Sequence, residues 1–242
     1  MEILFDEGYQ FGMGVFETVA VERGNPLFLR WHLERMANSL QELGIEQTVT
    51  EHQVREYLAA CKTDRAALKI LASEKNVVFT QRRNPYTAEK TRRGFRLRYS
   101  SIYRNETSPL VRHKTMNYGD CLLEKRRAAF LGAEELIFLN SRGEICEGTS
   151  SNIFFVSDGR LFTPPVSCGL LPGIVRRFLL ETFPVTERVM RKEDIMDMEE
   201  CFVTNSLMGV MPVTCLEERM FCRGAVTEKC RHAYENYEKT VP

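Results

Sequence analysis

The first half of the chain changes from a strand-like to a helix-like pattern of hydrophobic and polar positions. Residues 15–22, VFETVAVE, are rich in β-forming side chains and end at the turn 23–26, which predicts a strand entering a hairpin. After residue 30, apolar residues recur at helical spacing and Gly44 follows them: Leu33, Met36, Ala37, Leu40 and Leu43. This spacing predicts a helix that ends at Gly44.

A second helix is expected directly after Thr50, because a threonine side chain can cap the first turn of the segment 52–61. Three strand-like segments follow, at 66–73, 76–81 and 95–103. A strand, then helices, then more strands is typical of an α+β unit with an antiparallel sheet.

The second half alternates helix-like and strand-like segments. Helices are predicted at 120–131, after Pro172, and at 226–239, and strands at 135–140, 152–156 and 201–205. The polar segment 104–109, RNETSP, ends in proline and is interpreted as a linker. The chain is therefore expected to form an N-terminal α+β domain, 1–105, and a C-terminal α/β domain, 106–242, with a ligand in the cleft between them.

Composition excludes several classes of function. The 242 residues include 33 Lys or Arg and 33 Asp or Glu, so no overall basic field for nucleic acid exists. No apolar run approaches the ~20 residues that span a bilayer. The first ten residues, MEILFDEGYQ, carry acidic side chains where a signal peptide is basic, so a cytoplasmic location is expected. The eight cysteines form no C-x-x-C pair, which favours reduced thiols and predicts no metal site.

Short segments carry the candidate chemistry. The stretch FGMGVFET is not a dinucleotide fingerprint, because it lacks the third glycine and precedes a strand. Five further segments follow in order: HLERM at 32–36, HKTMNY at 113–118, EGTSSNIF at 147–154, LLPGI at 170–174 and NSLMGVMPV at 205–213. Together with GMGVFET they resemble the class IV aminotransferase family of pyridoxal-phosphate enzymes over nearly the whole chain. The resemblance implies a two-domain fold of the D-amino-acid aminotransferase-like type, α+β / α/β, with pyridoxal 5'-phosphate in the interdomain cleft of a homodimer.

The resemblance also implies roles for individual residues. Lys114, in the C-terminal domain, corresponds to the lysine that forms the Schiff base with the cofactor. An amine must lose its proton to attack an aldehyde, and the preceding cations Arg112 and His113 favour that loss. Glu147 corresponds to the carboxylate facing the pyridine nitrogen, and Arg35 to the arginine that binds the phosphate.

The remaining cofactor contacts are expected from the segments that precede and follow the last predicted strand. The phosphate is expected at the backbone N–H groups that follow Gly173. The residues assigned by resemblance are Ile174 and Val175 for those amides, Ser206 for a phosphate hydroxyl, Leu171 for one ring face and Tyr118 for the ring oxygen O3′.

The NSLMGVMPV segment and Thr18 resemble the aminodeoxychorismate lyases within the family. In that reaction, part of folate biosynthesis, Lys114 acts as general base and Thr18 helps deliver a proton, giving 4-aminobenzoate and pyruvate. The alternative is an aminotransferase acting on a D-amino acid or a branched-chain L-amino acid. A third hypothesis is a non-catalytic protein that binds the cofactor.

One position departs from the family pattern. Many members carry an Arg-Gly pair after the strand at 66–73, where this chain has Ser73-Glu74-Lys75-Asn76. A substrate carboxylate needs a cation nearby. The sequence leaves five candidates unranked: Lys75, Arg82, Arg83, Arg96 and Arg98.

Overall fold

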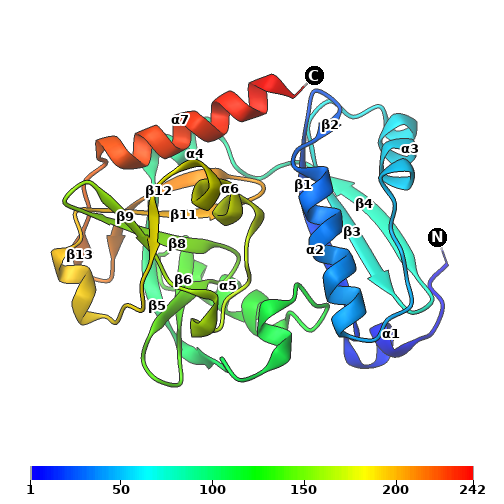
Figure 1. Ribbon diagram of the computed structural model, residues 1–242, viewed down its shortest axis with the longest axis horizontal. Helices are drawn as coiled ribbons and strands as arrows, with labels where there is room; N and C mark the ends of the chain where they lie inside the picture. Colours follow the sequence, from blue (N-terminus) through cyan, green and yellow to red (C-terminus); the bar gives the residue numbers. More distant parts are fainter. Residues whose placement is uncertain (1, 242) are drawn as a thin grey trace. The chain divides into compact units, whose positions relative to one another are not determined.

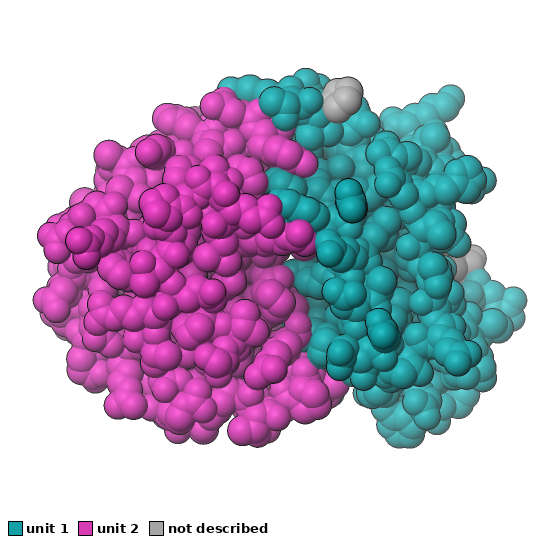
Figure 2. All heavy atoms as spheres, viewed as in Figure 1, with its two compact units in different colours: residues 1–85, 113–118, 238–242 teal, residues 86–112, 119–237 magenta. Residues whose placement is uncertain are grey.

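The computed structural model describes residues 2–241 and divides them into two compact units (Figure 2). Unit 1 comprises 2–85, 113–118 and 238–241, and unit 2 comprises 86–112 and 119–237. No helix formed by the described residues is long and apolar enough to cross a membrane.

Unit 1 is built on a four-stranded antiparallel sheet in the order β2-β1-β3-β4. Its strands are β1 (Gly14–Glu22), β2 (Asn25–Pro26), β3 (Ala66–Ser73) and β4 (Val77–Arg82), and its helices are α1 (Glu7–Phe11), α2 (Leu29–Glu42) and α3 (Glu51–Cys61). Figure 1 shows α2 (blue) lying along one face of this sheet. The strands expected at 15–22, 66–73 and 76–81 and the antiparallel sheet are confirmed.

The local sequence determines where the two main helices of unit 1 begin and end. Thr50 accepts the Gln53 N–H while Gln53 reaches back to the Thr50 N–H, forming a capping box at α3. Gly44 follows α2 with a positive φ of 68°, which glycine adopts without strain. The apolar side of α2 packs on the inward-facing side chains of β1 and β3, including Met36, Val19 and Leu68.

The segment 113–118 runs along β1. The Phe16 N–H donates to the Lys114 carbonyl at 2.8 Å, and the Met116 N–H donates to the Gly14 carbonyl at 2.8 Å. Val15 and Thr115 form an antiparallel bridge between the two segments. These backbone bonds fix Lys114 beside the strand that carries the GVFET segment.

Unit 2 contains a mixed nine-stranded sheet in the order β10-β9-β8-β11-β12-β5-β6-β7, with β13 paired to β12. Its strands are β5 (Phe95–Arg104), β6 (Glu135–Asn140), β7 (Ile145–Gly148), β8 (Asn152–Ser157), β9 (Arg160–Thr163), β10 (Val185–Glu187), β11 (Glu200–Asn205), β12 (Gly209–Leu216) and β13 (Arg219–Met220). Its helices are α4 (Ala88–Arg93), α5 (Gly119–Phe130), α6 (Ile174–Thr182) and α7 (Ala225–Thr240), with short 3-10 turns at Pro109–Arg112, Val166–Cys168 and Glu193–Asp197. Phe155, Val203, Met211 and Ile137 are among the side chains of its main core.

The two units do not follow the expected division at 105/106. Strand β5 pairs in parallel with both β12 and β6, so residues 95–104 belong to the second sheet. The backbone pairing with β1 instead places Lys114 in unit 1, not in a C-terminal domain. The segment 104–109 is also no free linker, because buried Glu106 accepts hydrogen bonds from Ser141 and Arg142.

Candidate active site

The strand period sorts the side chains of unit 1 onto two faces. Val19 of β1 and Leu68 of β3 point into the core under α2. Phe16 and Thr18, at the alternate positions of β1, therefore lie on the opposite face. Thr18 stands directly opposite Lys69 of β3 in the antiparallel register. This second face presents the predicted Thr18 together with a cation that the sequence analysis did not single out.

Lys114 extends its amine over two aromatic rings. Its Nζ lies 4.6 Å from the centroid of Phe16 and 5.0 Å from that of Tyr118. These two rings pack edge to face, 5.1 Å apart with an interplanar angle of 88°. The neighbouring His113 is held by Nδ1 at 3.0 Å from the Ser39 hydroxyl of α2. Lys114 and Tyr118 therefore lie together, beside the strand that carries Thr18.

Arg35 is held by a carboxylate that the sequence analysis did not assign to the site. Its Nε and Nη2 atoms donate to the two carboxylate oxygens of Glu17, each at 2.7 Å. Nδ1 of His32 lies 2.7 Å from Oε2 of the same Glu17. Glu17 and His32 are each 1% exposed, so this bidentate pair lies within the protein. A planar fork in this arrangement orients the guanidinium.

Burial and the neighbouring charges shift the pKa of Glu17 in opposite directions. Burial raises the pKa of Glu17, but the charges of Arg35 and His32 and their hydrogen bonds outweigh it and lower the pKa to about 2. Burial lowers the pKa of His32, against the attraction of Glu17. Nε2 of His32 has no hydrogen-bond partner among the described residues, which suits a neutral ring protonated at Nδ1.

The sequence contains a signal for Glu17 that the motif comparison did not use. In VFETVAVE, positions 15, 19 and 21 are valines on the buried face of β1. Glu17 shares their parity, so strand alternation alone places a carboxylate in the core. A buried carboxylate requires a cation, and the HLER segment supplies one.

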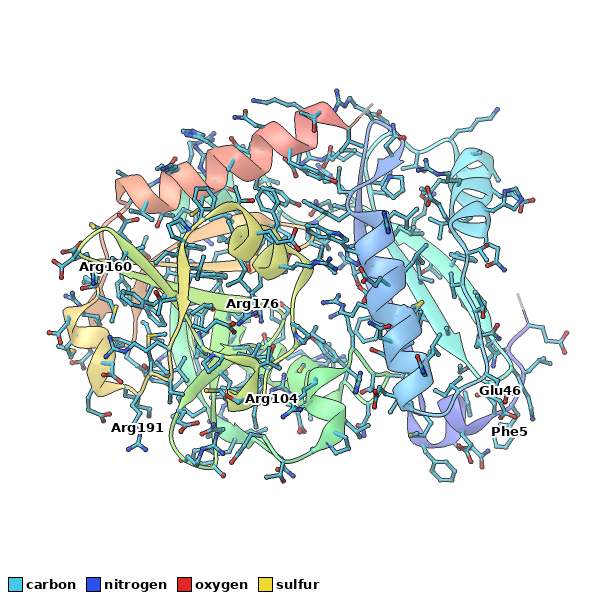
Figure 3. The ribbon with its side chains drawn as sticks, viewed as in Figure 1. Phe5, Glu46, Arg104, Arg160, Arg176 and Arg191 are labelled. Atoms are coloured by element: carbon cyan, nitrogen blue, oxygen red, sulfur yellow. The ribbon has the colours of Figure 1, made fainter. Side chains whose placement is uncertain are left out.

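Glu147, near the end of β7, lies at the centre of a second group in unit 2. Its Oε1 accepts a hydrogen bond from Nη2 of Arg104 at 2.8 Å, and its Oε2 accepts the Leu171 N–H at 3.1 Å. Arg104, labelled in Figure 3, also stacks its guanidinium 4.3 Å from the centroid of Phe138. Glu147 is 5% exposed, so this pair with Arg104 lies in the interior. Arg104 was not among the expected site residues.

The loop after Glu147 is fixed by another buried carboxylate. Glu135 is fully buried, and its Oε1 accepts from the Thr149 hydroxyl at 3.1 Å, the Ser150 N–H at 2.5 Å and the Ser150 hydroxyl at 3.1 Å. These bonds hold the residues that connect Glu147 to Asn152 at the start of β8.

The approach to α6 is tightly packed. Nδ2 of Asn152 donates to the Leu171 carbonyl at 2.8 Å. A Cβ on Gly173 would lie 2.0 Å from Oδ1 of Asn152, so any larger residue would require the Asn152 side chain to move. Gly173 is the N-cap of α6 and makes no side-chain cap hydrogen bond. The first-turn amides of Ile174 and Val175 therefore have no side-chain cap at this end of the helix.

Two other features bear on the expected phosphate contacts. Val175 supplies an amide but no hydroxyl. Ser206 lies in the turn between β11 and β12, where Oδ1 of Asn205 accepts the N–H groups of Leu207 at 2.9 Å and Met208 at 3.0 Å. Asn205 thus fixes the backbone of the turn that presents Ser206.

The five cations considered for a substrate carboxylate have different surroundings. Arg98 pairs with Glu217 at 3.2 Å, and Nζ of Lys75 donates to the Phe5 carbonyl at 3.4 Å. Arg82, Arg83 and Arg96 are exposed. Lys69 is half-buried and was absent from the expected set.

Each unit carries its own group of candidate residues. Unit 1 supplies an amine, a hydroxyl and a fixed guanidinium, and unit 2 supplies a buried carboxylate and an uncapped helix end. Among residues 2–241, no group of three or more His, Cys, Asp or Glu side chains could hold a metal ion.

The fold is that of the class IV aminotransferases. A branched-chain aminotransferase from Escherichia coli matches it with a TM-score of 0.85 at 22% identity, over 98% of this chain and 88% of that one. The model of the family "amino-transferase class IV" matches residues 14–216, and the chain belongs to this family.

Relatives in this family include lyases as well as aminotransferases. The aminodeoxychorismate lyase of Bacillus subtilis (strain 168) is 30% identical over 240 residues, covering 88% of this chain and 81% of that protein. The structure of 4-amino-4-deoxychorismate lyase from Pseudomonas aeruginosa is similar, with a TM-score of 0.86 and 25% identity over 98% of this chain and 95% of that one. The chain is thus an enzyme of the class IV aminotransferase and lyase group.

Proposed function

We propose that this enzyme is a pyridoxal 5'-phosphate-dependent lyase that converts 4-amino-4-deoxychorismate to 4-aminobenzoate and pyruvate, a step in folate biosynthesis. The observation that carries the proposal is the position of the Lys114 amine, over Phe16 and Tyr118 and beside the strand that presents Thr18. The similarity to proteins named as aminodeoxychorismate lyases supports the same reaction.

The residues of this chain fit the cofactor. Lys114 would hold its aldehyde, Arg35 and the amides of Ile174 and Val175 its phosphate, and Glu147 its ring nitrogen. Ser206 would add a hydroxyl to the phosphate, Leu171 would cover one ring face, and Tyr118 would contact O3′. When bound, the cofactor supplies an aldehyde that links to an amine and a ring that accepts electrons.

Lys114 and Thr18 would then move the protons. Lys114 would take the proton from the substrate ring carbon that carries the amino group. The bond between the adjacent ring carbon and the enolpyruvyl oxygen would then break, which completes the aromatic ring, and Thr18 would help deliver a proton to the departing enolpyruvate, giving pyruvate. Because both side chains are positioned by β1 and its neighbours, their geometry is fixed before the substrate binds.

The decisive experiment is incubation of the cofactor-loaded protein with 4-amino-4-deoxychorismate. We expect equimolar 4-aminobenzoate and pyruvate, with no lasting conversion of the cofactor to its pyridoxamine form. A panel of D-amino acids and branched-chain L-amino acids tests the aminotransferase alternative. Keto acid and pyridoxamine phosphate formed from that panel, without lyase products, would contradict the proposal. Cofactor binding without turnover of either class would support a non-catalytic protein.

We also propose that the enzyme acts as a homodimer. Several apolar side chains of unit 2 are exposed: Leu122 at 50%, Leu123 at 58% and Phe130 at 90%, all on α5, and Tyr103 at 63%. Exposed apolar groups of this size are typical of surfaces that bind another protein. Sedimentation equilibrium should give twice the chain mass, and a monomer at micromolar concentration would contradict the dimer.

A cytoplasmic location is part of the same proposal. All eight cysteines are free thiols, six of them buried. Unpaired cysteines in this number suit a reducing compartment. Cell fractionation would test it, and recovery in a membrane or secreted fraction would contradict it.

A further inference from the structure

A cavity of about 410 Å³ lies in unit 1, formed by residues of the β1–β2 turn and of the C-terminal end of α3. Three cationic residues line it, Arg23, Arg55 and Lys62, together with the apolar residues Pro26 and Leu58. Pockets that bind small molecules have volumes of about 300–1,000 Å³ and combine apolar walls with a few polar groups. The cavity therefore has the size and the lining of a site for a small ligand.

Strand β1 separates this cavity from the candidate catalytic residues of unit 1. Phe16, beside the Lys114 amine, lies near the start of β1, and Arg23 directly follows the last strand residue, Glu22. At about 3.3 Å per residue, the strand from Phe16 to Glu22 spans about 20 Å. None of the residues that line the cavity is assigned to the cofactor or the substrate, so it is a separate place in the protein.

Two of the three cations stand at strained backbone positions. Arg23, before Gly24 in the β1–β2 turn, has a φ of 51°, and Lys62, the C-cap of α3, has a φ of 49°. Glycine or asparagine is usual at both kinds of position, because other side chains are disfavoured in the left-handed region. The Gly24 N–H donates to the Asp64 carbonyl at 2.8 Å, which fixes the two segments beside each other. Strained positions concentrate at functional sites, and here both place a cation on one cavity.

Arg23 is oriented by backbone carbonyl groups near the end of α7. Its Nη2 donates to the carbonyls of Glu238 at 2.8 Å and Lys239 at 3.0 Å. Carbonyl groups orient a guanidinium without neutralising its charge. Within the described part of the chain, the side-chain hydrogen bonds of Arg23 all use Nη2. Nε and Nη1 therefore remain as donors for a ligand.

The charges around the cavity leave a positive excess. Arg55 donates through Nε and Nη2 to the same carboxylate oxygen of Glu51, at 2.8 and 2.6 Å. Among the residues that the structure describes, no carboxylate forms an ion pair with Lys62. Asp64 in the lining and Glu51 beside it balance two of the three cations, so one positive charge remains. A guanidinium and an ammonium group on one cavity favour an anionic ligand.

We propose that this cavity binds a small organic anion that carries one carboxylate or phosphate group on an apolar body. Arg23 and Lys62 hold the anionic group, and Pro26 and Leu58 pack against the apolar body. The proposal goes beyond the lyase reaction and does not depend on it, because the cavity shares no residue with the candidate active site.

The first experiment titrates the cofactor-loaded, ¹⁵N-labelled protein with 2-naphthoate and follows the amide signals of Gly24 and Thr63, two residues of the lining. We expect saturable shifts of both signals, with a dissociation constant below about 1 mM. 2-Naphthamide, which lacks the charge, and inorganic phosphate, which lacks the apolar body, should bind at least about tenfold more weakly. Comparison of 2-naphthoate with 2-naphthyl phosphate shows which anionic group the site prefers.

Variants of Lys62 separate ligand binding from folding. Lys62→Gly relieves the strained φ, so Tm should rise by about 2–4 °C, while loss of the cation should weaken 2-naphthoate binding by about tenfold. Lys62→Arg keeps the charge and should bind within about threefold of the wild type. The control, Arg65→Met, removes a nearby cation that pairs with Glu22 outside the lining, and should change affinity less than about twofold.

Three results would overturn the proposal: no shift of the Gly24 and Thr63 signals with millimolar 2-naphthoate, equal binding of 2-naphthamide, or unchanged affinity in Lys62→Gly. Each is a measurement of binding at a place remote from Lys114, so none of them bears on the lyase reaction. Absence of lyase turnover in the wild-type enzyme would in turn leave this binding site standing.

Discussion

Nη2 of Arg104 donates to Oε1 of Glu147 at 2.8 Å, while Oε2 of that carboxylate accepts the Leu171 N–H at 3.1 Å. One buried negative charge therefore joins the end of β5 to the segment that leads into α6. Arg104 is the cationic partner of Glu147, and Glu147 positions the residue expected to cover the cofactor ring.

Replacement of Glu147 by glutamine should separate cofactor binding from chemistry. Glutamine can still accept a hydrogen bond, but it cannot hold a protonated ring nitrogen by charge. We expect retained cofactor binding and a kcat lower by about 100-fold or more, the size of effect seen when a preorganised electrostatic contact is removed. Arg98→Met removes another β5 arginine, from an exposed pair with Glu217, and should leave kcat within about twofold. Equal kcat in Glu147→Gln and the wild type would show that Glu147 has no role in the reaction.

Lys114→Ala should abolish the visible absorbance of the Schiff base and all turnover, while the chain remains folded. The side chain is partly exposed and lies over ring faces, so its loss removes little packing. Absorbance spectra and circular dichroism measure the two effects. Lys192→Ala, which removes an exposed lysine lying 4.4 Å from the Tyr99 ring centroid, is the control and should keep both signals. Full turnover in Lys114→Ala would refute the assignment.

Much of the secondary structure could be predicted, because the spacing of apolar residues and the helix-capping residues are local properties of the sequence. The strand at 66–73 and the helix capped by Thr50 form where the sequence predicts them. The division of the chain could not be predicted from local pattern. It depends on β5 pairing in parallel with β12, which lies more than a hundred residues further along the chain.

Motif resemblance singled out Lys114, Arg35 and Glu147 as candidates but did not include the groups that hold them. Glu17, Arg104 and Glu135 act through side chains distant in sequence, so no short motif contains both partners of a pair. Of these groups, only Glu17 could be predicted from the sequence, because it occupies the same face of its strand as the buried valines. Lys69 was missed for the same reason, because its relation to Thr18 is set by strand register.

Glu17→Gln should destabilise the protein and weaken cofactor binding together. The substitution leaves Arg35 without its counterion, and breaking a buried ion pair of this kind costs about 3–5 kcal/mol. Urea unfolding and cofactor titration measure the two effects. Glu22→Gln, on the same strand and paired with the exposed Arg65, should cost less than about 1 kcal/mol. Similar losses in both variants would show that Glu17 has no special role.

The same group predicts how stability depends on pH. Because the pKa of Glu17 falls from 4.5 to about 2 on folding, its contribution, about 3 kcal/mol, is complete above pH 4.5 and is lost as the pH falls toward 2. The lowered pKa of His32 also makes protonation unfavourable in the folded state, so its contribution begins to fall below about pH 6.5. Unfolding free energy measured from pH 7 to pH 3 should decline throughout, and Glu17→Gln should flatten the part below pH 4.5. A wild-type curve that rises on acidification would contradict both assignments.

Gly173→Ala tests whether the approach to α6 is part of the cofactor site. The added Cβ would lie 2.0 Å from Oδ1 of Asn152, so Asn152 must move and its 2.8 Å hydrogen bond to the Leu171 carbonyl must break. Loss of that buried bond should cost about 1–3 kcal/mol of stability, and displacement of the helix end should weaken cofactor affinity by about tenfold or more. The matched control is Gly119→Ala at the start of α5, where a Cβ would meet nothing within 4 Å and alanine favours the helix. Cofactor titration followed at the Schiff-base absorbance distinguishes the two variants. If Gly173→Ala binds the cofactor as tightly as Gly119→Ala, the N-terminus of α6 does not hold the phosphate.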